Sequence, residues 1–318
     1  MVPLGGLLVL SIAAILFSGS RASAQARSET ARNSPRIING VAVFPGQGPW
    51  AVSLRRPSAP GDSTRIHFCG GSFVGPRYDD ALQIVAGWSS SEVRPQWVLT
   101  AAHCVVKDGE TIKASELRVL GGTRDLSDAT KGEEQAVERI IVHESFNNLT
   151  LENDIALLKL SEPAKDIART LRNTVRLPSI GDINWVGKPY LAVRAQGWGR
   201  TAGGYQSPTL QEVVIPLVER SICRSVFEPN GEKIPEGAIC GGFVSGDFDS
   251  CQGDSGGPLV YRSQSSSARS GFSVDPVLIG VISWGIGCGF ADLYGVYTSS
   301  LFYRKWAETA VQNYYLGK

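Results

Sequence analysis

The feature that most constrains this chain is the glycine-rich stretch DSCQGDSGGP, which runs from Asp249 to Pro258. Within it, Ser255 stands between Asp254 and two glycines. Glycines let the backbone make a tight turn without a Cβ clash, so a side chain at the turn is exposed. They also leave backbone N–H groups free to bind a developing oxyanion. A serine hydroxyl is a good nucleophile only when a base takes its proton. The stretch therefore predicts a nucleophile that needs a base from elsewhere in the chain.

Candidates for that base and for an acid to orient it lie in two apolar runs. His103 lies near the end of WVLTAAHC, and Asp154 begins the strand-like part of NDIALL. The chain order is thus His, Asp, Ser. Together, TAAHC, NDIALL and GDSGGP resemble the chymotrypsin/trypsin family of serine proteases. The resemblance spans residues 36 to about 316, which is nearly all of the chain after its apolar beginning.

This resemblance implies a secreted serine endopeptidase that works through an acyl-enzyme and needs no cofactor or metal. Ser255 would be the nucleophile, His103 the general base and Asp154 the group that orients the imidazole. The backbone N–H groups of Gly253 and Ser255 would form the oxyanion hole. The alternative is a catalytically weak protease homologue that acts as a binding protein.

The resemblance also implies the substrate preference. Asp249 matches the aspartate at the base of the pocket in trypsin-like members, where a buried carboxylate binds the Arg or Lys before the cut. Ser250 beside it would add a hydrogen bond. The remaining substrate-binding residues would pair with the substrate backbone or keep the pocket open, and they are Ser283, Trp284, Gly285 and Gly295.

The N-terminal region resembles a leader and an activation segment. Residues 1 to 20 carry no charged side chain, and a small-residue stretch follows, so residues 1-24 are predicted to be a signal peptide; an uncleaved anchor is the alternative. Residues 25-36 would be a propeptide, cut after Arg36. The freed amine of Ile37 would then pair with Asp254, so the protease domain would be residues 37-318, in a secreted, extracellular zymogen.

Composition is that of an ordinary globular protein, with 42% hydrophobic and 19% charged residues. The formal net charge is +1, and the first 36 residues hold four arginines against one glutamate. The rest of the chain is therefore slightly acidic, which argues against a nucleic-acid partner. The expected partners are protein or peptide substrates, an activating protease and proteinaceous inhibitors, and the protein is expected to be a monomer.

Six cysteines allow 15 pairings, and their even number fits an oxidising compartment. The resemblance selects one set of three. It implies disulfides between Cys69 and Cys104, between Cys223 and Cys240, and between Cys251 and Cys288. Each is expected to contribute about 2–4 kcal/mol of stability.

Short apolar runs alternate with turns along the chain, which holds 36 glycines and 17 prolines. The predicted fold class is all-β, with two packed antiparallel β-barrels and a C-terminal α-helix. The barrels are expected at about 37-165 and 175-300. Helical spacing predicts a helix at about 302-316, with Ser299 and Ser300 as candidate caps, packed on the second barrel.

Two stretches exceed the family pattern. Cys69 and Cys104 are 35 positions apart, and the surplus at about 75–95 is either a surface loop or a gene-model error. Distortion of the first barrel by this surplus is what would favour the binding-protein alternative. Residues 261–275 are Ser-rich and polar, and they predict a second surface loop.

Other candidate site residues have less specific signals. His67 and His143 lie next to or within strand-like runs and are predicted to be structural. Residues 121–134 correspond to a calcium loop of some family members, but Gly122 stands where a carboxylate is needed, so no metal is expected. Asn148 begins the only N-glycosylation sequon, NLT, just before Asp154.

Overall fold

The computed structural model describes residues 37–57, 67–75, 96–164, 174–201, 203–262 and 276–318. The predicted signal peptide and propeptide, including Arg36, lie outside these residues. So does almost all of the surplus at 75–95, and so do residues 263–275 of the second surplus.

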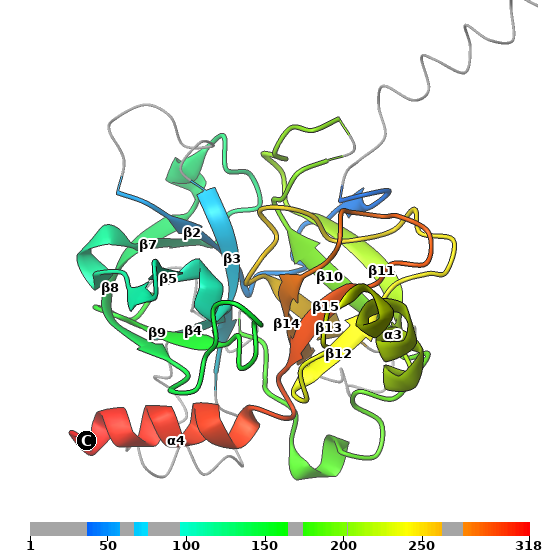
Figure 1. Cartoon of the computed structure of the whole chain (residues 1–318). Coiled ribbons are helices and arrows are strands. Elements are labelled where there is room, and N and C mark those ends of the chain that lie inside the picture. The colour runs from blue at the N-terminus through cyan, green and yellow to red at the C-terminus, as the bar shows by residue number, and fades with distance from the viewer. Residues whose placement is uncertain (1–36, 58–66, 76–95, 165–173, 202, 263–275) are drawn as a thin grey trace, which may run out of the picture. The chain divides into compact units, whose positions relative to one another are not determined.

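The first barrel is a closed antiparallel sheet with the strand order β2-β3-β4-β9-β8-β7 (Figure 1). Its strands are rich in Val, Leu and other apolar residues, and most of their side chains are buried inside. The bounds are Ala51–Arg55 (β2), His67–Val74 (β3), Trp97–Thr100 (β4), Arg118–Gly121 (β7), Glu133–Val142 (β8) and Ala156–Leu160 (β9). A two-stranded hairpin of β5 (Val106–Lys107) and β6 (Glu110–Thr111) lies between β4 and β7 in sequence.

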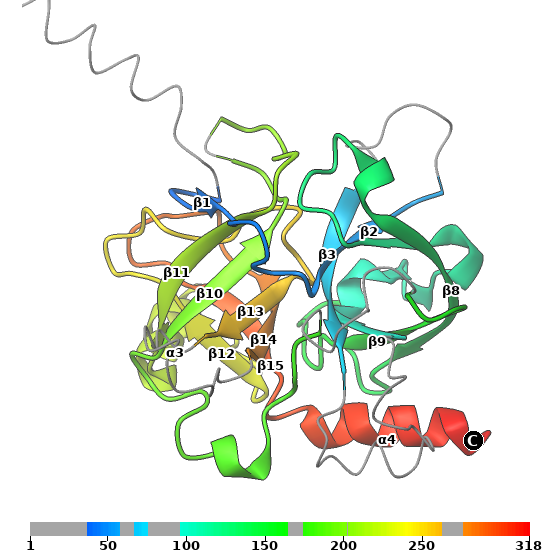
Figure 2. The ribbon, with the colours of Figure 1, turned by 180° about the vertical axis from the view of Figure 1, so that it is seen from behind.

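The second barrel has the order β11-β10-β13-β14-β15-β12 and is closed by pairing between β11 and β12 (Figure 2). Strand β1 (Val41–Ala42) extends this sheet beside β11. The other bounds are Ala192–Gly197 (β10), Gln211–Val218 (β11), Ala238–Gly241 (β12), Pro258–Tyr261 (β13), Val277–Trp284 (β14) and Gly295–Ser299 (β15). The predicted all-β fold of two antiparallel barrels is therefore confirmed.

Short helices connect the strands. The helix α3 (Arg220–Phe227) packs near β12, and its Cys223 and Phe227 share a small apolar cluster with Tyr294 and Val296. The one-turn helices are Ala102–Cys104 (η2), Ala114–Glu116 (η3), Ala129–Lys131 (η4), Ile180–Asp182 (η6) and Glu228–Asn230 (η7).

Strand register brings two of the predicted site residues together. Thr100 at the end of β4 pairs with Ala156 at the start of β9. His103 follows β4 by three residues and Asp154 precedes β9 by two, so antiparallel pairing places both side chains at the same end of the barrel. The pairing of β4 with β9 thus brings His103 and Asp154 close together.

The C-terminal helix α4 (Arg304–Tyr315) packs on the first barrel, and the predicted packing on the second barrel is wrong. Its buried residues Ala307 and Val311 join the apolar cluster of the first barrel, and the Tyr314 ring lies edge-on to Trp97, 5.2 Å between centroids. The physical reason is the large apolar side chain of Trp97 at the start of β4, which the helix covers. Figures 1 and 2 both show α4 beneath the first barrel.

The predicted helix cap is also wrong. The helix begins at Arg304, and Tyr303 is its N-cap residue, with no side-chain cap bond. Ser299 accepts from the N–H of Phe302, and Ser300 donates to the carbonyl of Leu278. Both serines therefore stabilise the turn between β15 and the helix, because a turn of several residues separates the strand from the helix.

A buried ion pair holds the segment that connects the barrels. The guanidinium of Arg176 donates two hydrogen bonds to the carboxylate of Asp182, and the two side chains are only 6% and 10% exposed. We expect Arg176→Ala to lower the free energy of unfolding by about 3–5 kcal/mol, because it leaves a buried carboxylate without its partner. Denaturant unfolding with the disulfides intact measures this loss.

The matched control for this prediction is Arg224→Ala. Arg224 pairs with Glu228 on the surface, where the side chains are 54% and 37% exposed. This substitution is expected to cost less than about 1 kcal/mol. Equal losses for the two arginines would contradict the role given to the buried pair.

Candidate active site

His103 and Asp154 form a hydrogen-bonded pair. The Nδ1 atom of His103 lies 2.8 Å from Oδ2 of Asp154, and the backbone N–H of His103 donates to Oδ1 at 2.9 Å. Asp154 is fully buried, whereas the His103 side chain is 23% exposed. A carboxylate only accepts, so Nδ1 carries the proton and the neutral ring has its lone pair on Nε2. This is the tautomer that a base at Nε2 needs.

The second barrel also holds Asp154. Ser283 of β14 donates to its carboxylate, and Thr298 of β15 donates to its backbone carbonyl at 2.8 Å. Burial alone would raise the pKa of Asp154, but the charge of the nearby His103 and the hydrogen bonds from His103 and Ser283 keep it below its usual value. Burial lowers the pKa of His103. The charge of Asp154 and its hydrogen bond raise this pKa by more, so the net shift is upward. The acid is therefore ionised and stabilises an imidazolium.

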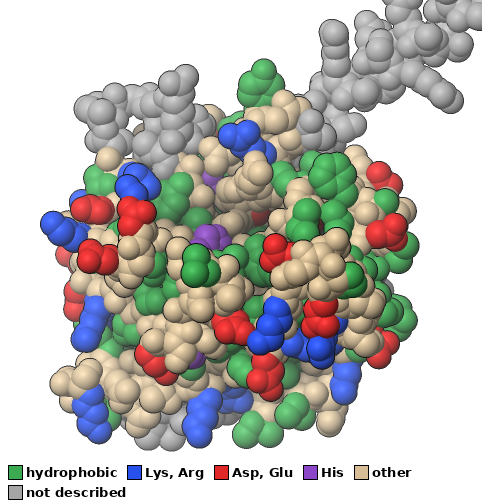
Figure 3. Space-filling view, viewed as in Figure 1, with side chains coloured by type: hydrophobic (Ala, Val, Ile, Leu, Met, Phe, Trp, Pro, Cys, Tyr) green, Lys and Arg blue, Asp and Glu red, His purple; other side chains and the backbone are tan. Residues whose placement is uncertain are grey.

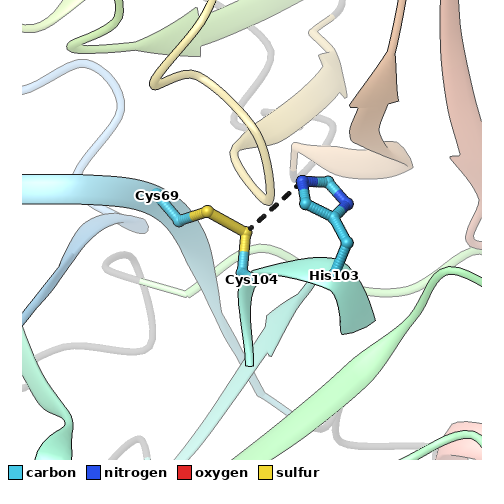
Figure 4. A group of neighbouring side chains, drawn as sticks. All are labelled: Cys69, His103 and Cys104. Atoms are coloured by element: carbon cyan, nitrogen blue, oxygen red, sulfur yellow. Dashed lines mark hydrogen bonds between the residues drawn. A yellow bond between two sulfur atoms is a disulfide. The ribbon is translucent and has the colours of Figure 1, made fainter. Parts of the chain in front are cut away.

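A disulfide packs against the imidazole. Cys104 follows His103 and is bonded to Cys69 of β3, and its sulfur lies 3.8 Å from Nε2 (Figure 4). Among the described residues, these three form the one group with metal-ligand proximity. Both sulfurs are in the disulfide, so neither is the thiolate that a metal would need. The other two implied disulfides, Cys223–Cys240 and Cys251–Cys288, are also formed.

The loop around Ser255 uses nearly all of its backbone groups. From Cys251 to Ser255, every carbonyl accepts a hydrogen bond from the described chain. From Gly253 to Gly257, by contrast, only the N–H groups of Gly253 and Ser255 have no acceptor among the described residues. Unpaired N–H groups are rare in a well-ordered loop. These two are therefore available to a ligand oxygen.

Ser255 and His103 line one pocket of about 340 Å³ between the barrels. Figure 3 shows a hollow in this face of the molecule with a histidine side chain at its wall. Within the described residues no hydrogen bond joins Nε2 of His103 to the Ser255 hydroxyl. Such bonds are often long without substrate and shorten when it binds.

Asp249 lies in the same pocket and is 8% exposed. Its Oδ2 accepts from the N–H of Gly289 at 3.0 Å, and no basic side chain of the described chain pairs with it. Burial raises the pKa of Asp249 to about 6. A buried carboxylate without a cation is costly. The pocket therefore favours a ligand that carries a positive charge.

The remaining predicted pocket residues have distinct environments. A Cβ on Gly285 would meet no atom nearer than 3.9 Å, so this glycine leaves open space. A Cβ on Gly295 would lie 2.6 Å from the hydroxyl of Tyr297, so this glycine also makes room for the buried Tyr297 side chain. The same hydroxyl lies 3.4 Å from Oγ of Ser250. Trp284 lines the pocket beside these residues.

Asp254 is completely buried beside the Ser255 loop. Its two oxygens accept from the N–H groups of Gly199 and Cys251 at 2.7 and 2.8 Å, and burial raises its pKa to about 7. No cation of the described chain lies on it. The Ile37 side chain is also fully buried, and a bridge between Ile38 and Asp249 holds the chain near the pocket.

Several site residues carry no signal in the sequence. Leu151, Gln252, Ile282 and Gly287 line the pocket, but they lie in ordinary apolar or polar contexts. Only their proximity to Asp154, Ser255 and Trp284 in sequence could have indicated them. His143 packs against Tyr303 and Trp306, as a structural histidine does. Asn148 lies exposed in the turn before Asp154.

Comparison with known proteins identifies the family. Residues 85–307 match the family model described as Trypsin. The serine proteinase stubble of Drosophila melanogaster is 34% identical over 282 residues, which cover 87% of this chain and 31% of that relative. The chain thus belongs to the trypsin family of serine proteases, and it spans less than a third of the length of this relative. In the described residues, none of the helices has both the length and the apolar character to cross a membrane.

Proposed function

We propose that this protein is a secreted serine endopeptidase that cuts peptide bonds after Arg or Lys. The observation that carries the reaction type is the hydrogen-bonded pair of His103 and the buried Asp154 in one pocket with Ser255, whose loop has two N–H groups without an acceptor among the described residues. This is the set of groups that acyl transfer requires: a nucleophile, an oriented base and oxyanion donors.

In this mechanism Nε2 of His103 takes the proton of the Ser255 hydroxyl as the oxygen attacks the peptide carbonyl. Asp154 keeps Nδ1 protonated and stabilises the imidazolium that forms. The N–H groups of Gly253 and Ser255 donate to the oxyanion, and each such bond is worth roughly 3 kcal/mol in the transition state. The imidazolium then protonates the leaving amine, and water releases the acyl group.

The proposed preference for Arg or Lys rests on Asp249. A guanidinium or ammonium entering the pocket would pair with this carboxylate and remove the cost of its burial. A peptide-library digest of the protein cut after Arg36 tests the proposal. We expect cuts almost entirely after Arg and Lys. Faster cutting after Phe would overturn the specificity, and no cutting would favour a binding protein.

The pH profile tests the role of His103. The base must be neutral, and its pKa is raised above the ordinary value of about 6.5. The kcat/KM for an Arg peptide is therefore expected to fall as pH drops through a value above 6.5, and then about tenfold per pH unit. Initial rates from pH 5 to 8 measure the midpoint of this fall. A midpoint well below pH 6.5 would contradict the proposed pair of His103 and Asp154.

We further propose that the protein is made as a zymogen. No cation of the residues that the structure describes lies on the buried Asp254 carboxylate, and cutting after Arg36 would free an α-amine at Ile37 to neutralise it. The disulfides fit an oxidising, extracellular compartment. An activating protease and proteinaceous inhibitors would be the partners besides substrates.

Asp254→Asn tests the activation proposal. An amide cannot form the charged pair, so kcat/KM of the Arg36-processed variant is expected to fall about a hundredfold, with the disulfides still formed. Steady-state kinetics on an Arg peptide measure the change. Arg36→Gln should leave the protein uncut and nearly inactive. Full activity in that uncut variant would refute the zymogen proposal.

A glycan at Asn148 is the remaining proposal for this face. The side chain is exposed, and Leu151 of the same turn lines the pocket. A glycan there would border the cleft. Mass spectrometry of the secreted protein before and after enzymatic deglycosylation would detect it.

A further inference from the structure

His67 links the first barrel to the loop that carries the proposed oxyanion donors. It begins β3, is 4% exposed, and its Nε2 lies 3.1 Å from the carbonyl oxygen of Gly253. Its Nδ1 lies 2.7 Å from the hydroxyl of Ser53 on β2. The contact with Ser53 is buried and the contact with Gly253 is partly buried, and the second one joins residues 186 positions apart in sequence. Nothing in the proposed chemistry so far uses this histidine.

The hydrogen-bond partners determine the form of the ring. The Gly253 carbonyl can only accept, so Nε2 must carry a proton. The Ser53 hydroxyl can donate to Nδ1, which leaves a neutral imidazole with both nitrogens satisfied. Burial lowers the pKa of His67 to about 4, and the nearby Arg55 acts in the same direction against the hydrogen bond to Gly253. The ring therefore stays neutral at the pH at which the enzyme works.

Gly253 needs such support because its backbone is unusually free to turn. Its φ is +95°, a region that glycine alone enters easily. The peptide on its N-terminal side carries the oxyanion donor. There the carbonyl of Gln252 accepts from the N–H of Arg200 at 2.7 Å. Carbonyl and N–H point in opposite directions in a trans peptide, so this bond turns the Gly253 N–H away from Arg200.

The peptide on the other side of Gly253 is held by His67. If that bond were lost, the carbonyl could rotate, and the Gly253 backbone would rotate with it. A second bond from β3, the N–H of Gly70 to the carbonyl of Ser255 at 2.7 Å, holds the next part of the loop. Strand β3 thus anchors the loop at two carbonyls, one by a side chain and one by backbone.

We propose that His67 is a positioning residue that keeps the Gly253 N–H aimed at the oxyanion through its hydrogen bond to the Gly253 carbonyl. This rests on the proposed protease function. Its effect differs from that of a histidine that only fills the core. Loss of a core residue would weaken the whole barrel and so the binding of every ligand. Loss of His67 is expected to weaken mainly the binding of ligands that carry an oxyanion.

The test compares two inhibitors on His67→Ala, processed at Arg36. An arginine boronate forms a tetrahedral anion on Ser255 and uses the oxyanion donors, whereas benzamidine needs only the Asp249 pocket. We expect kcat on an Arg peptide to fall about ten- to a hundredfold with KM nearly unchanged, and boronate affinity to fall by a similar factor. Benzamidine affinity should change less than about twofold, because no group that binds it has moved.

Two further variants keep the test decisive if His67→Ala does not fold. His67→Gln retains a side-chain N–H donor and should recover part of kcat. Ser53→Ala leaves the ring in place but frees it to turn, so a smaller loss of the same kind is expected. Equal weakening of both inhibitors in any folded variant, or unchanged kcat in Ser53→Ala and His67→Gln together with unchanged boronate affinity, would overturn the proposal.

The wild-type protein separates this proposal from the function on which it depends. If the processed wild type cuts no peptide of the library, or Ser255→Ala leaves cutting intact, the protease function fails whatever the His67 variants do. If the wild type cuts and Ser255→Ala does not, the His67 variants alone decide the positioning role. Thermal unfolding of each variant checks that its fold is retained.

Discussion

Ser255→Ala is expected to lower kcat for an Arg peptide by about a millionfold. The substitution removes the hydroxyl that we propose as the nucleophile, whereas the other two serines that line the pocket, Ser250 and Ser283, contact Tyr297 and Asp154 instead. Without it no acyl-enzyme forms, and the pair of His103 and Asp154 has no proton to take. KM is expected to change little, because Asp249 and the pocket walls remain.

Single-turnover and steady-state kinetics on a fluorogenic Arg peptide measure this loss. The matched control is Ser225→Ala on α3, where an exposed serine donates to the carbonyl of Ile222. That variant should retain activity within about threefold. A Ser255→Ala protein that keeps a tenth of the wild-type rate, after removal of contaminating protease, would exclude Ser255 as the nucleophile.

Asp249→Ser is expected to destabilise the transition state for Arg and Lys peptides by about 3–5 kcal/mol. This lowers kcat/KM for these peptides roughly a hundred- to several-thousandfold. The substrate cation would enter a buried pocket with no opposite charge, and its desolvation would be uncompensated. Peptides with a neutral residue before the cut should lose much less. The ratio of kcat/KM for Arg and Lys peptides to kcat/KM for neutral peptides should therefore fall in this variant.

The control for charge is Asp128→Ser, which removes an exposed acid on the first barrel that pairs with Lys131. Both substitutions change the net charge equally, so long-range attraction of a cationic peptide affects both alike. Asp128→Ser is expected to keep the wild-type kcat/KM within about twofold. Equal losses in the two variants would show that Asp249 acts only through overall charge.

Much of the fold could be predicted from the sequence because its signals are local. Alternating short apolar runs and turns predict barrels, and the order of His103, Asp154 and Ser255 in three motifs predicts one cleft. The structure pairs Thr100 with Ala156, which brings His103 to Asp154. It also forms the three implied disulfides. The disulfide pairing was implied by the family resemblance, because six cysteines alone allow 15 pairings.

The rest depends on contacts between distant segments. Helical spacing located α4, but it could not say which barrel has an uncovered apolar surface, and Trp97 on the first barrel provides it. The two serines near residue 300 looked like caps because capping residues and turn residues are the same types. The bond from His67 to the Gly253 carbonyl spans 186 positions, and no local pattern indicates it.

The most direct measurement is the site of covalent labelling by an arginine-like diaryl phosphonate, read by mass spectrometry of the protein cut after Arg36. A phosphonate reacts only with a serine that an adjacent base activates. We predict a single adduct on Ser255, no adduct in His103→Ala, and much slower labelling in Asp249→Ser. Absence of an adduct from the processed wild type, or an adduct on a different residue, would contradict the account.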